Sequence, residues 1–315
     1  MNTHFSARDW GFALAIIVIW GLNFVAMKFG LRDFTPFQMG LWRYIFAALP
    51  LVFFIRPPKV PVRWVLLYGL CQGVGQFGFL FSALQFGMTA ALASVLMQTQ
   101  VFFTALFGVL LLGERLRTAQ YAALALAALG LGFFATHFIA AHAYSTASNT
   151  QNITLLAFGL NLCAAASWAA SNIVARKAQQ AAPGYDPLAF VLWTSLVPLL
   201  PFLLFTTAID DPALRWRWTQ APWTSWLAVA YLGWVATLAA YAMWTALLSR
   251  HSVNTVAPLS LGVPVVGITA GMVILAEQVS GWQWAGIVCV VGALAVVLFG
   301  ESVWQRLRRG RQTLP

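Results

Sequence analysis

The chain has 315 residues, of which 61% are hydrophobic and 8% are charged. A soluble domain carries about 25% charged residues, so this composition excludes a soluble globular fold and indicates an integral membrane protein. The formal net charge of +10 does not indicate a nucleic-acid partner, because the basic residues are scattered among short segments between apolar runs.

Apolar runs without charge follow one another along the chain. One transmembrane helix needs about 20 such residues, and glycine or polar clusters at residues 85–91 and 142–152 divide the longest runs. The first run is too long for the core of a signal peptide. We therefore expect an all-α polytopic membrane protein with ten transmembrane helices, near residues 9–28, 36–55, 63–84, 89–112, 118–137, 153–175, 187–208, 222–248, 253–276 and 281–300.

The distribution of Lys and Arg predicts the orientation of these helices. With the amino terminus inside, cytoplasmic segments hold 13 of these residues and external segments hold four. The positive-inside rule then places both termini in the cytoplasm of a multi-pass inner-membrane protein. The basic tail RLRRGR is expected to contact lipid headgroups.

The chain also contains a weak internal repeat. Residues 68–134 align with residues 231–297 at a constant offset of 163, with ten identities in 67 positions, including Glu114 with Glu277. WGLNF in the first helix also corresponds to WAASN in the sixth. Five helices per half would place the halves in opposite orientations, as in inverted-repeat transporters. We expect two five-helix repeats, residues 1–141 and 153–301, and a basic cytoplasmic tail, residues 302–315.

Amphipathic spacing identifies residues that should face the interior of the bundle. Side chains three or four residues apart share a helix face, and an unpaired amide facing lipid costs a few kcal/mol. The stretch VAPLSLGVPVVG, with two prolines flanking a glycine, predicts a broken helix of the kind that lines transporter sites. The resulting candidates for substrate binding are Trp20, Asn23, Gln76, Gln98, Trp168, Asn172, Tyr241, Trp244 and Ser260.

Each candidate also has a structural interpretation. Polar side chains often join transmembrane helices through hydrogen bonds, aromatic residues also pack or anchor helices at membrane interfaces, and the proline-flanked stretch is also compatible with a static kink. Arg43, about seven residues into the second helix, could contact a substrate carboxylate, or its side chain could snorkel or bind neighbouring backbone. Glu114 and Glu277 are expected to be solvated helix-end carboxylates that anchor loops.

The motifs WGLNFV, GLRDFTPFQMGLWRY, YGLCQGVGQFGFLFSALQFGM, SVLMQTQVFFTALFG with GERL, SWAASNI and APLSLGVPVVG resemble those of the EamA-type transporters of the drug/metabolite transporter superfamily. The resemblance spans nearly the whole chain. It implies ten helices, inverted halves, a central cavity, and export of amino-acid metabolites such as cysteine-pathway compounds or related amino acids.

The expected function is therefore export of small amino-acid-like metabolites by alternating access. The expected partners are a small-molecule metabolite and membrane lipids, with no nucleic acid and no cofactor or metal. A monomer is sufficient to form one cavity, and a dimer is also compatible with the sequence. A polyspecific drug exporter is the alternative, since its cavity would also be aromatic. A membrane-embedded enzyme is less favoured, because the sequence lacks GxxxxGK, HExxH and GxSxG motifs.

Overall fold

The computed structural model describes residues 6–113, 116, 118–144, 155–248, 250–251 and 256–312, and at several helix ends it describes the backbone alone. All regular elements in this part of the chain are helices. Glu114 and the loop expected at residues 142–152 lie largely outside these described residues, as do the side chains of the basic tail.

The helices of the first half are α1 (Ala7–Gly30), α2 (Pro36–Ala48), η1 (Leu51–Phe53), α3 (Val62–Tyr68), η2 (Gly69–Phe77), α4 (Gly78–Gln85), α5 (Ala90–Leu96), η3 (Met97–Thr99), α6 (Gln100–Leu112) and α7 (Thr118–Tyr144). Two of these segments depart from α-helical geometry in the interior of a longer helix. η2 is a π-helix and η3 is a 3₁₀ turn.

The helices of the second half are α8 (Leu155–Ala181), α9 (Pro187–Thr194), α10 (Leu199–Ala208), η4 (Arg217–Gln220), α11 (Trp223–Ala230), η5 (Tyr231–Ala239), α12 (Ala240–Leu248), η6 (Ala257–Leu261), α14 (Gly262–Ile274) and α15 (Gly281–Gln312). Here too a π-helix, η5, and a 3₁₀ segment, η6, occur within longer helical stretches.

Seven helical stretches are long and apolar enough to cross a membrane, namely Ala7–Gly30, Val62–Gln85, Ala90–Leu111, Ala119–Thr136, Leu155–Ala181, Pro187–Ala208 and Trp223–Trp244. Two shorter apolar helices, Leu259–Ile274 and Gly281–Val297, follow them. The chain is thus a multi-pass, all-helical membrane protein in the residues described.

The second expected helix is shorter than predicted. It was expected to reach residue 55, but α2 ends at Ala48 and the next residue, Leu49, is extended with φ −96° and ψ 140°. Pro50 follows, and a residue before proline is pushed out of the α region by steric conflict with the proline ring. The helices expected to end at residues 137 and 175 instead continue to Tyr144 and Ala181.

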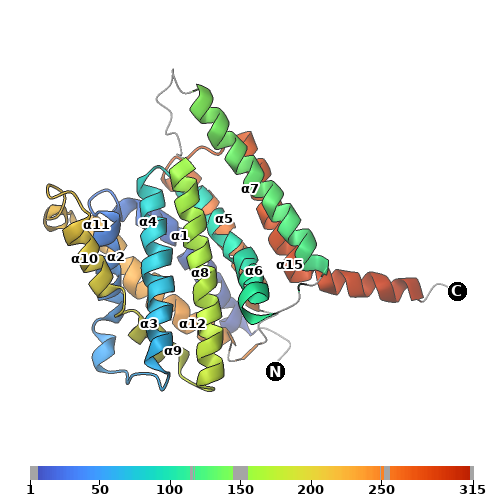
Figure 1. Cartoon of the computed structure of the whole chain (residues 1–315), viewed down its shortest axis with the longest axis horizontal. Coiled ribbons are helices and arrows are strands. Elements are labelled where there is room, and N and C mark those ends of the chain that lie inside the picture. Colours follow the sequence, from blue (N-terminus) through green and yellow to red (C-terminus); the bar gives the residue numbers. More distant parts are fainter. Residues whose placement is uncertain are drawn as a thin grey trace.

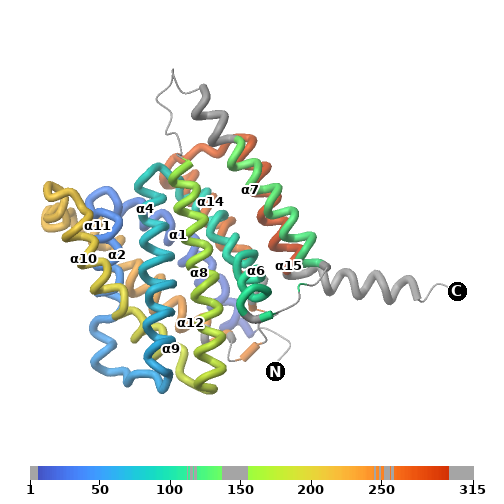
Figure 2. Tube along the Cα trace, in the orientation of Figure 1, coloured from blue at the N-terminus to red at the C-terminus, as the bar shows by residue number. Residues whose placement is uncertain are grey.

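The helices form one bundle with two distinguishable ends (Figure 1). We call the end where α1 begins, at Ala7, the proximal end, and the end where α1 finishes, at Gly30, the distal end. α7 and α15 run side by side and lean away from the remaining helices, which Figure 2 also shows. α1 packs against α14, α12, α11, η5 and α5, whereas α8 packs against η2, α6 and α4.

α1 and α14 cross at very short range. A Cβ atom at Gly267 would lie 2.5 Å from Cβ of Ser94, and one at Gly21 would lie 2.5 Å from Cβ of Val266. Small residues at helix interfaces allow such close backbone approach in membranes. These two glycines therefore hold α1, α5 and α14 together beside the bundle centre.

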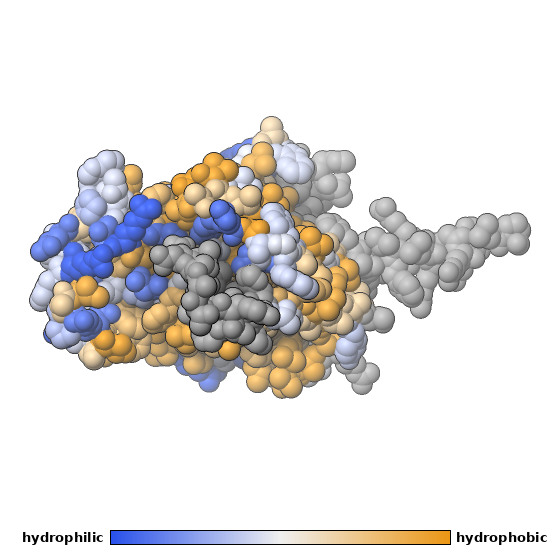
Figure 3. All heavy atoms as spheres, turned by 90° about the horizontal axis from the view of Figure 1, so that it is seen from above, coloured by the Kyte–Doolittle hydropathy of each residue, from blue (hydrophilic) through white to orange (hydrophobic). Residues whose placement is uncertain are grey.

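The outer surface is strongly apolar. Large exposed hydrophobic side chains include Leu110, Leu200, Val273 and Val288. Viewed from the distal end, hydrophobic residues form much of the visible rim, whereas hydrophilic residues gather on the side of α10 and α11 (Figure 3). This is the surface of a protein whose sides face lipid.

Candidate functional site

A cavity of about 380 Å³ lies inside the bundle. This volume is in the range of small-molecule sites. Its wall includes all nine residues that the sequence singled out, namely Trp20, Asn23, Gln76, Gln98, Trp168, Asn172, Tyr241, Trp244 and Ser260. The residues come from α1, η2, η3, α8, α12 and η6, so the amphipathic faces of these helices converge on one space.

An aromatic cluster covers one side of the cavity. The ring centroid of Trp20 lies 5.5 Å from that of Tyr241 and 5.4 Å from that of Trp244. The Trp20 indole N–H donates to the carbonyl of Ala236 at 3.1 Å, which fixes the ring. These rings line the site and also join α1 to α12, so packing and cavity lining coincide here.

Two of the predicted amides make hydrogen bonds between helices. Gln98 Nε2 donates to the Ser260 carbonyl at 3.0 Å, and so joins the two 3₁₀ segments η3 and η6. Asn172 Nδ2 donates to Oε1 of Gln100 at 2.9 Å and to Oγ1 of Thr104 at 3.2 Å. Gln100 also lines the cavity, although it is not among the nine candidates from the sequence.

Gln76 differs from these amides. It is 5% exposed and belongs to the π-helix η2. Its carbonyl oxygen is buried and has no hydrogen-bond partner among the described residues. A buried acceptor without a partner is costly, so this oxygen lacks the hydrogen-bond donor that would stabilise it.

Arg43 is the cavity residue whose role the sequence left open. It is 3% exposed and lines the cavity from α2. Its Nη2 donates to Oγ1 of Thr237 at 3.1 Å and its Nη1 to Oδ1 of Asn23 at 3.4 Å. Its guanidinium carbon lies 3.8 Å from the ring centroid of Phe77. The Arg43 side chain therefore points into the bundle. The interpretation that it snorkels to the membrane surface is wrong.

Asn23 therefore accepts a hydrogen bond from the buried guanidinium group of Arg43. Its Oδ1 faces Arg43, and its Nδ2 lies 4.0 Å from the sulfur of Met27, a weak acceptor. With 8% exposure it also borders the cavity. Asn23 thus has both of the roles that the sequence allowed, an interhelical contact and a place in the wall.

The distal end of the bundle is tightly packed. Met27 and Met88 are fully buried there. The carboxylate of Glu277 accepts from the backbone N–H groups of Ala90 at 2.7 Å and Ala91 at 2.9 Å, at the first turn of α5. Glu277 is half-buried rather than fully solvated, and it anchors the loop after α14 to the start of α5, because the orphan N–H groups of a helix start attract an anion.

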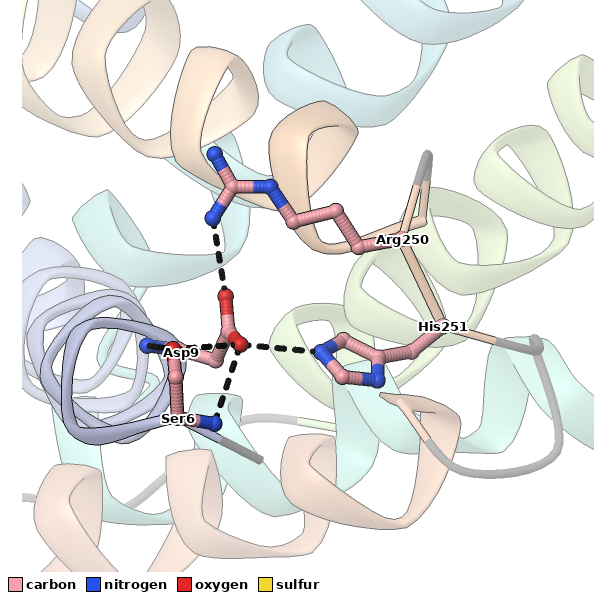
Figure 4. Close-up of polar contacts among 4 residues, drawn as sticks. All are labelled: Ser6, Asp9, Arg250 and His251. Carbon is pink, nitrogen blue, oxygen red and sulfur yellow. Dashed lines mark hydrogen bonds and ion pairs between the residues drawn. The ribbon is translucent and has the colours of Figure 1, made fainter. Parts of the chain in front are cut away.

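The proximal end has its own polar cluster, drawn in Figure 4. Asp9 accepts from the backbone and hydroxyl of Ser6 in a capping box at the start of α1. The same carboxylate pairs with Arg250 at 3.0 Å and contacts His251 Nε2 at 3.1 Å. The chain beyond α12 is thereby connected to the first turn of α1.

Within the described part of the chain, no three His, Cys, Asp or Glu side chains group as metal ligands. Cys71, Cys163 and Cys289 are free thiols. The polar groups at the cavity are amides, hydroxyls, aromatic rings and one guanidinium, which suit binding by hydrogen bonds and charge.

A many-helix membrane bundle around a polar and aromatic cavity is the architecture of a transporter. The EamA-like transporter family matches residues 10–136 and again residues 154–299. The chain belongs to this family, which points to a transporter rather than an enzyme.

The chain is similar along its whole length to named proteins. It is 40% identical over 304 residues to a "Probable amino-acid metabolite efflux pump" of Salmonella typhimurium strain LT2, covering 96% of this chain and 99% of that protein. It is 38% identical over 296 residues to the protein of the same name in Escherichia coli K12, with 94% and 96% coverage. A solved crystal structure superposes with a TM-score of 0.59 over 96% of this chain and 99% of its own, at 20% identity, which shows the fold alone.

Proposed function

We propose that the chain exports small amino-acid-like metabolites across the cytoplasmic membrane by alternating access through the central cavity. The observation that carries the proposal is the cavity itself, lined by helices from both family matches. Alternating access needs a site between two halves that opens to one side at a time. The names of the Salmonella and Escherichia relatives favour amino-acid metabolites as the cargo.

The proposed membrane arrangement is ten helices in two inverted five-helix repeats, residues 1–141 and 153–301, with both termini in the cytoplasm. The two family matches and the excess of basic residues in the segments assigned to the cytoplasm support it. The distal end then faces outward. Lipids surround the bundle, and one monomer contains the whole cavity.

Reporter fusions test this arrangement. A reporter after residue 312 or within residues 57–62 should be active in the cytoplasm, and one within residues 142–150 should be active outside. An external carboxy terminus contradicts the inverted arrangement of the halves.

The nine cavity residues are the proposed binding wall, with the amides holding polar groups and the rings bounding apolar ones. The aromatic cluster around Trp20 also favours a second candidate, a polyspecific exporter of organic cations. Purified protein in proteoliposomes separates the two. If the protein exports amino-acid metabolites, it should transport labelled amino acids, and other unlabelled amino acids should inhibit this transport. Ethidium should inhibit the transport strongly only if the protein is a polyspecific exporter of organic cations.

A further inference from the structure

We propose that Arg43 binds the carboxylate of the exported substrate and that the Gln76 carbonyl accepts a hydrogen bond from its ammonium group. The site would then select zwitterionic α-amino acids over amines, amides and dyes. This inference rests on the proposed function and names the chemical group that the cavity recognises.

The first argument is the burial of an uncompensated cation. Arginine remains charged in proteins, and Arg43 is 3% exposed. Its hydrogen-bond acceptors, Asn23 and Thr237, are neutral, and it takes part in no ion pair between described residues. Burying an ion without an opposite charge is expensive, so a substrate anion in the adjoining cavity would relieve a cost that the protein alone leaves in place.

The second argument is the donor geometry. The Nε of Arg43 is buried without a hydrogen-bond partner among the described residues. Guanidinium groups bind carboxylates through two parallel N–H donors. The ring of Phe77, 3.8 Å from the guanidinium carbon, covers one face and leaves the edge for hydrogen bonding. On the other side the free space near Arg43 measures only about 20 Å³, room for a single water, so a carboxylate would have to come from the large cavity.

The third argument is the complementary acceptor. Gln76 lines the same cavity as Arg43, and its side-chain oxygen is buried without a partner among the described residues. An ammonium group has three donors, and the faces of Trp20 and Tyr241 in the same wall attract cations. One wall therefore offers a fixed positive charge together with groups suited to a small cation, which is the pattern of a zwitterion.

Substrate competition in wild-type proteoliposomes is the direct test. Efflux of labelled L-serine is measured in the presence of one of three unlabelled competitors. These are L-serine itself, L-serinamide, which lacks the carboxylate charge, and glycerate, which lacks the amino group. L-serine should compete at least 10-fold better than serinamide, because a charge-assisted hydrogen bond is lost with the amide. Glycerate should fall between the two.

Three variants then assign the groups. Arg43→Gln should weaken L-serine binding roughly 10- to 100-fold and leave serinamide binding unchanged. The L-serine affinity of Arg43→Lys should lie between those of Arg43→Gln and wild type, because lysine keeps the positive charge but lacks the two parallel N–H donors of the guanidinium group. Gln76→Leu should weaken serine but not glycerate. Arg217→Gln is the matched control, since Arg217 is exposed and donates to the Arg32 carbonyl away from the cavity.

The outcomes separate this inference from the function on which it rests. Serine transport with equal competition by serinamide overturns the carboxylate role of Arg43 while export stands. Ethidium transport without amino-acid transport overturns both. If Arg43→Gln does not fold, the wild-type competition series and Arg43→Lys still decide. Loss of serine and serinamide binding to the same extent in Arg43→Lys assigns the arginine to packing and overturns the proposal.

Discussion

Removal of the Glu277 carboxylate should release the distal end of the bundle. Its two oxygens accept from Ala90 and Ala91 at 2.7 and 2.9 Å, and these residues lie at the start of α5 in the other family match. Glu277→Ala removes both bonds and the charge at this helix start. Glu277→Gln keeps one acceptor oxygen and removes the charge and the other acceptor.

The magnitude follows from these contacts. A hydrogen bond to a charged group contributes roughly 1.5–3 kcal/mol, and a charge at a helix terminus roughly 0.3–1 kcal/mol. Glu277 is only half-buried, so water takes over part of its role when it is lost. A net loss of about 2 kcal/mol for Glu277→Ala shifts the closed-to-open equilibrium of the distal end about 25-fold. Glu277→Gln, at about 1 kcal/mol, shifts it about 5-fold.

Thiol labelling measures this shift. Met88→Cys, in a background lacking Cys71, Cys163 and Cys289, places the reporter at a fully buried distal position. A membrane-impermeant reagent should label it about 25-fold faster in Glu277→Ala, because the rate follows the open population when opening is fast.

Gln278→Ala is the control for this labelling, since Gln278 is the exposed neighbour of Glu277. It should label at the rate of the parent. An unchanged rate in Glu277→Ala at normal membrane abundance would refute the role of this carboxylate as a distal clamp.

Three further predictions concern the cavity wall and the packing of α14 beside it. Gln98→Leu and Asn172→Leu each remove an amide of the proposed binding wall, and the loss of a neutral hydrogen bond to substrate, at roughly 0.5–1.5 kcal/mol, should lower substrate affinity about 2- to 10-fold. Because the same amides also bond between helices, a fall in membrane abundance alone assigns them to packing. Asn23→Cys in the same cysteine-free background should react with a small water-soluble thiol reagent and be protected by substrate, while inertness in an active variant makes Asn23 purely structural. Gly267→Ala introduces a Cβ 2.5 Å from Ser94, so thermal unfolding should show a loss of about 1–3 kcal/mol; an unchanged midpoint shows that α14 can shift away.

The sequence predicts the helices well because lipid imposes a simple rule. Every spanning segment must satisfy its own backbone and present apolar side chains, so the apolar runs coincide with α1 and the later long helices. The end of α2 is not visible in hydropathy, because LPLVFF after Ala48 is as apolar as the helix before it. There the local steric effect of Pro50 decides, and the extended Leu49 shows it.

The sequence predicts which helix faces line the cavity, but not the contacts between them. Helical spacing identifies which side of a helix is polar, and all nine candidates meet around one space. It does not identify partners on other helices, so the contact of Asn23 with Arg43 and the contact of Asn172 with Gln100 could not be inferred. For the same reason the partners of Glu277 could not be inferred, since its two N–H donors lie 187 and 186 residues away in the chain.

The irregular helical segments provide a further link between the repeat and the site. Shifting the π-helix Gly69–Phe77 by 163 positions gives 232–240, one residue from the π-helix Tyr231–Ala239. The same shift takes the 3₁₀ turn at 97–99 to 260–262, which overlaps the 3₁₀ segment Ala257–Leu261.

Each of these four segments contributes to the cavity wall, through Gln76, Ala236, Gln98 and Ser260. Two sequences with only ten identities in 67 aligned positions thus keep the same interruptions at the same depth, which supports the proposed repeat more strongly than the identities do. Such segments are tolerated at membrane depth where they are buried in protein or line a cavity, and they often mark hinges and functional sites. A helix that bends at one of them would change the shape of the cavity directly, because these segments form part of its wall.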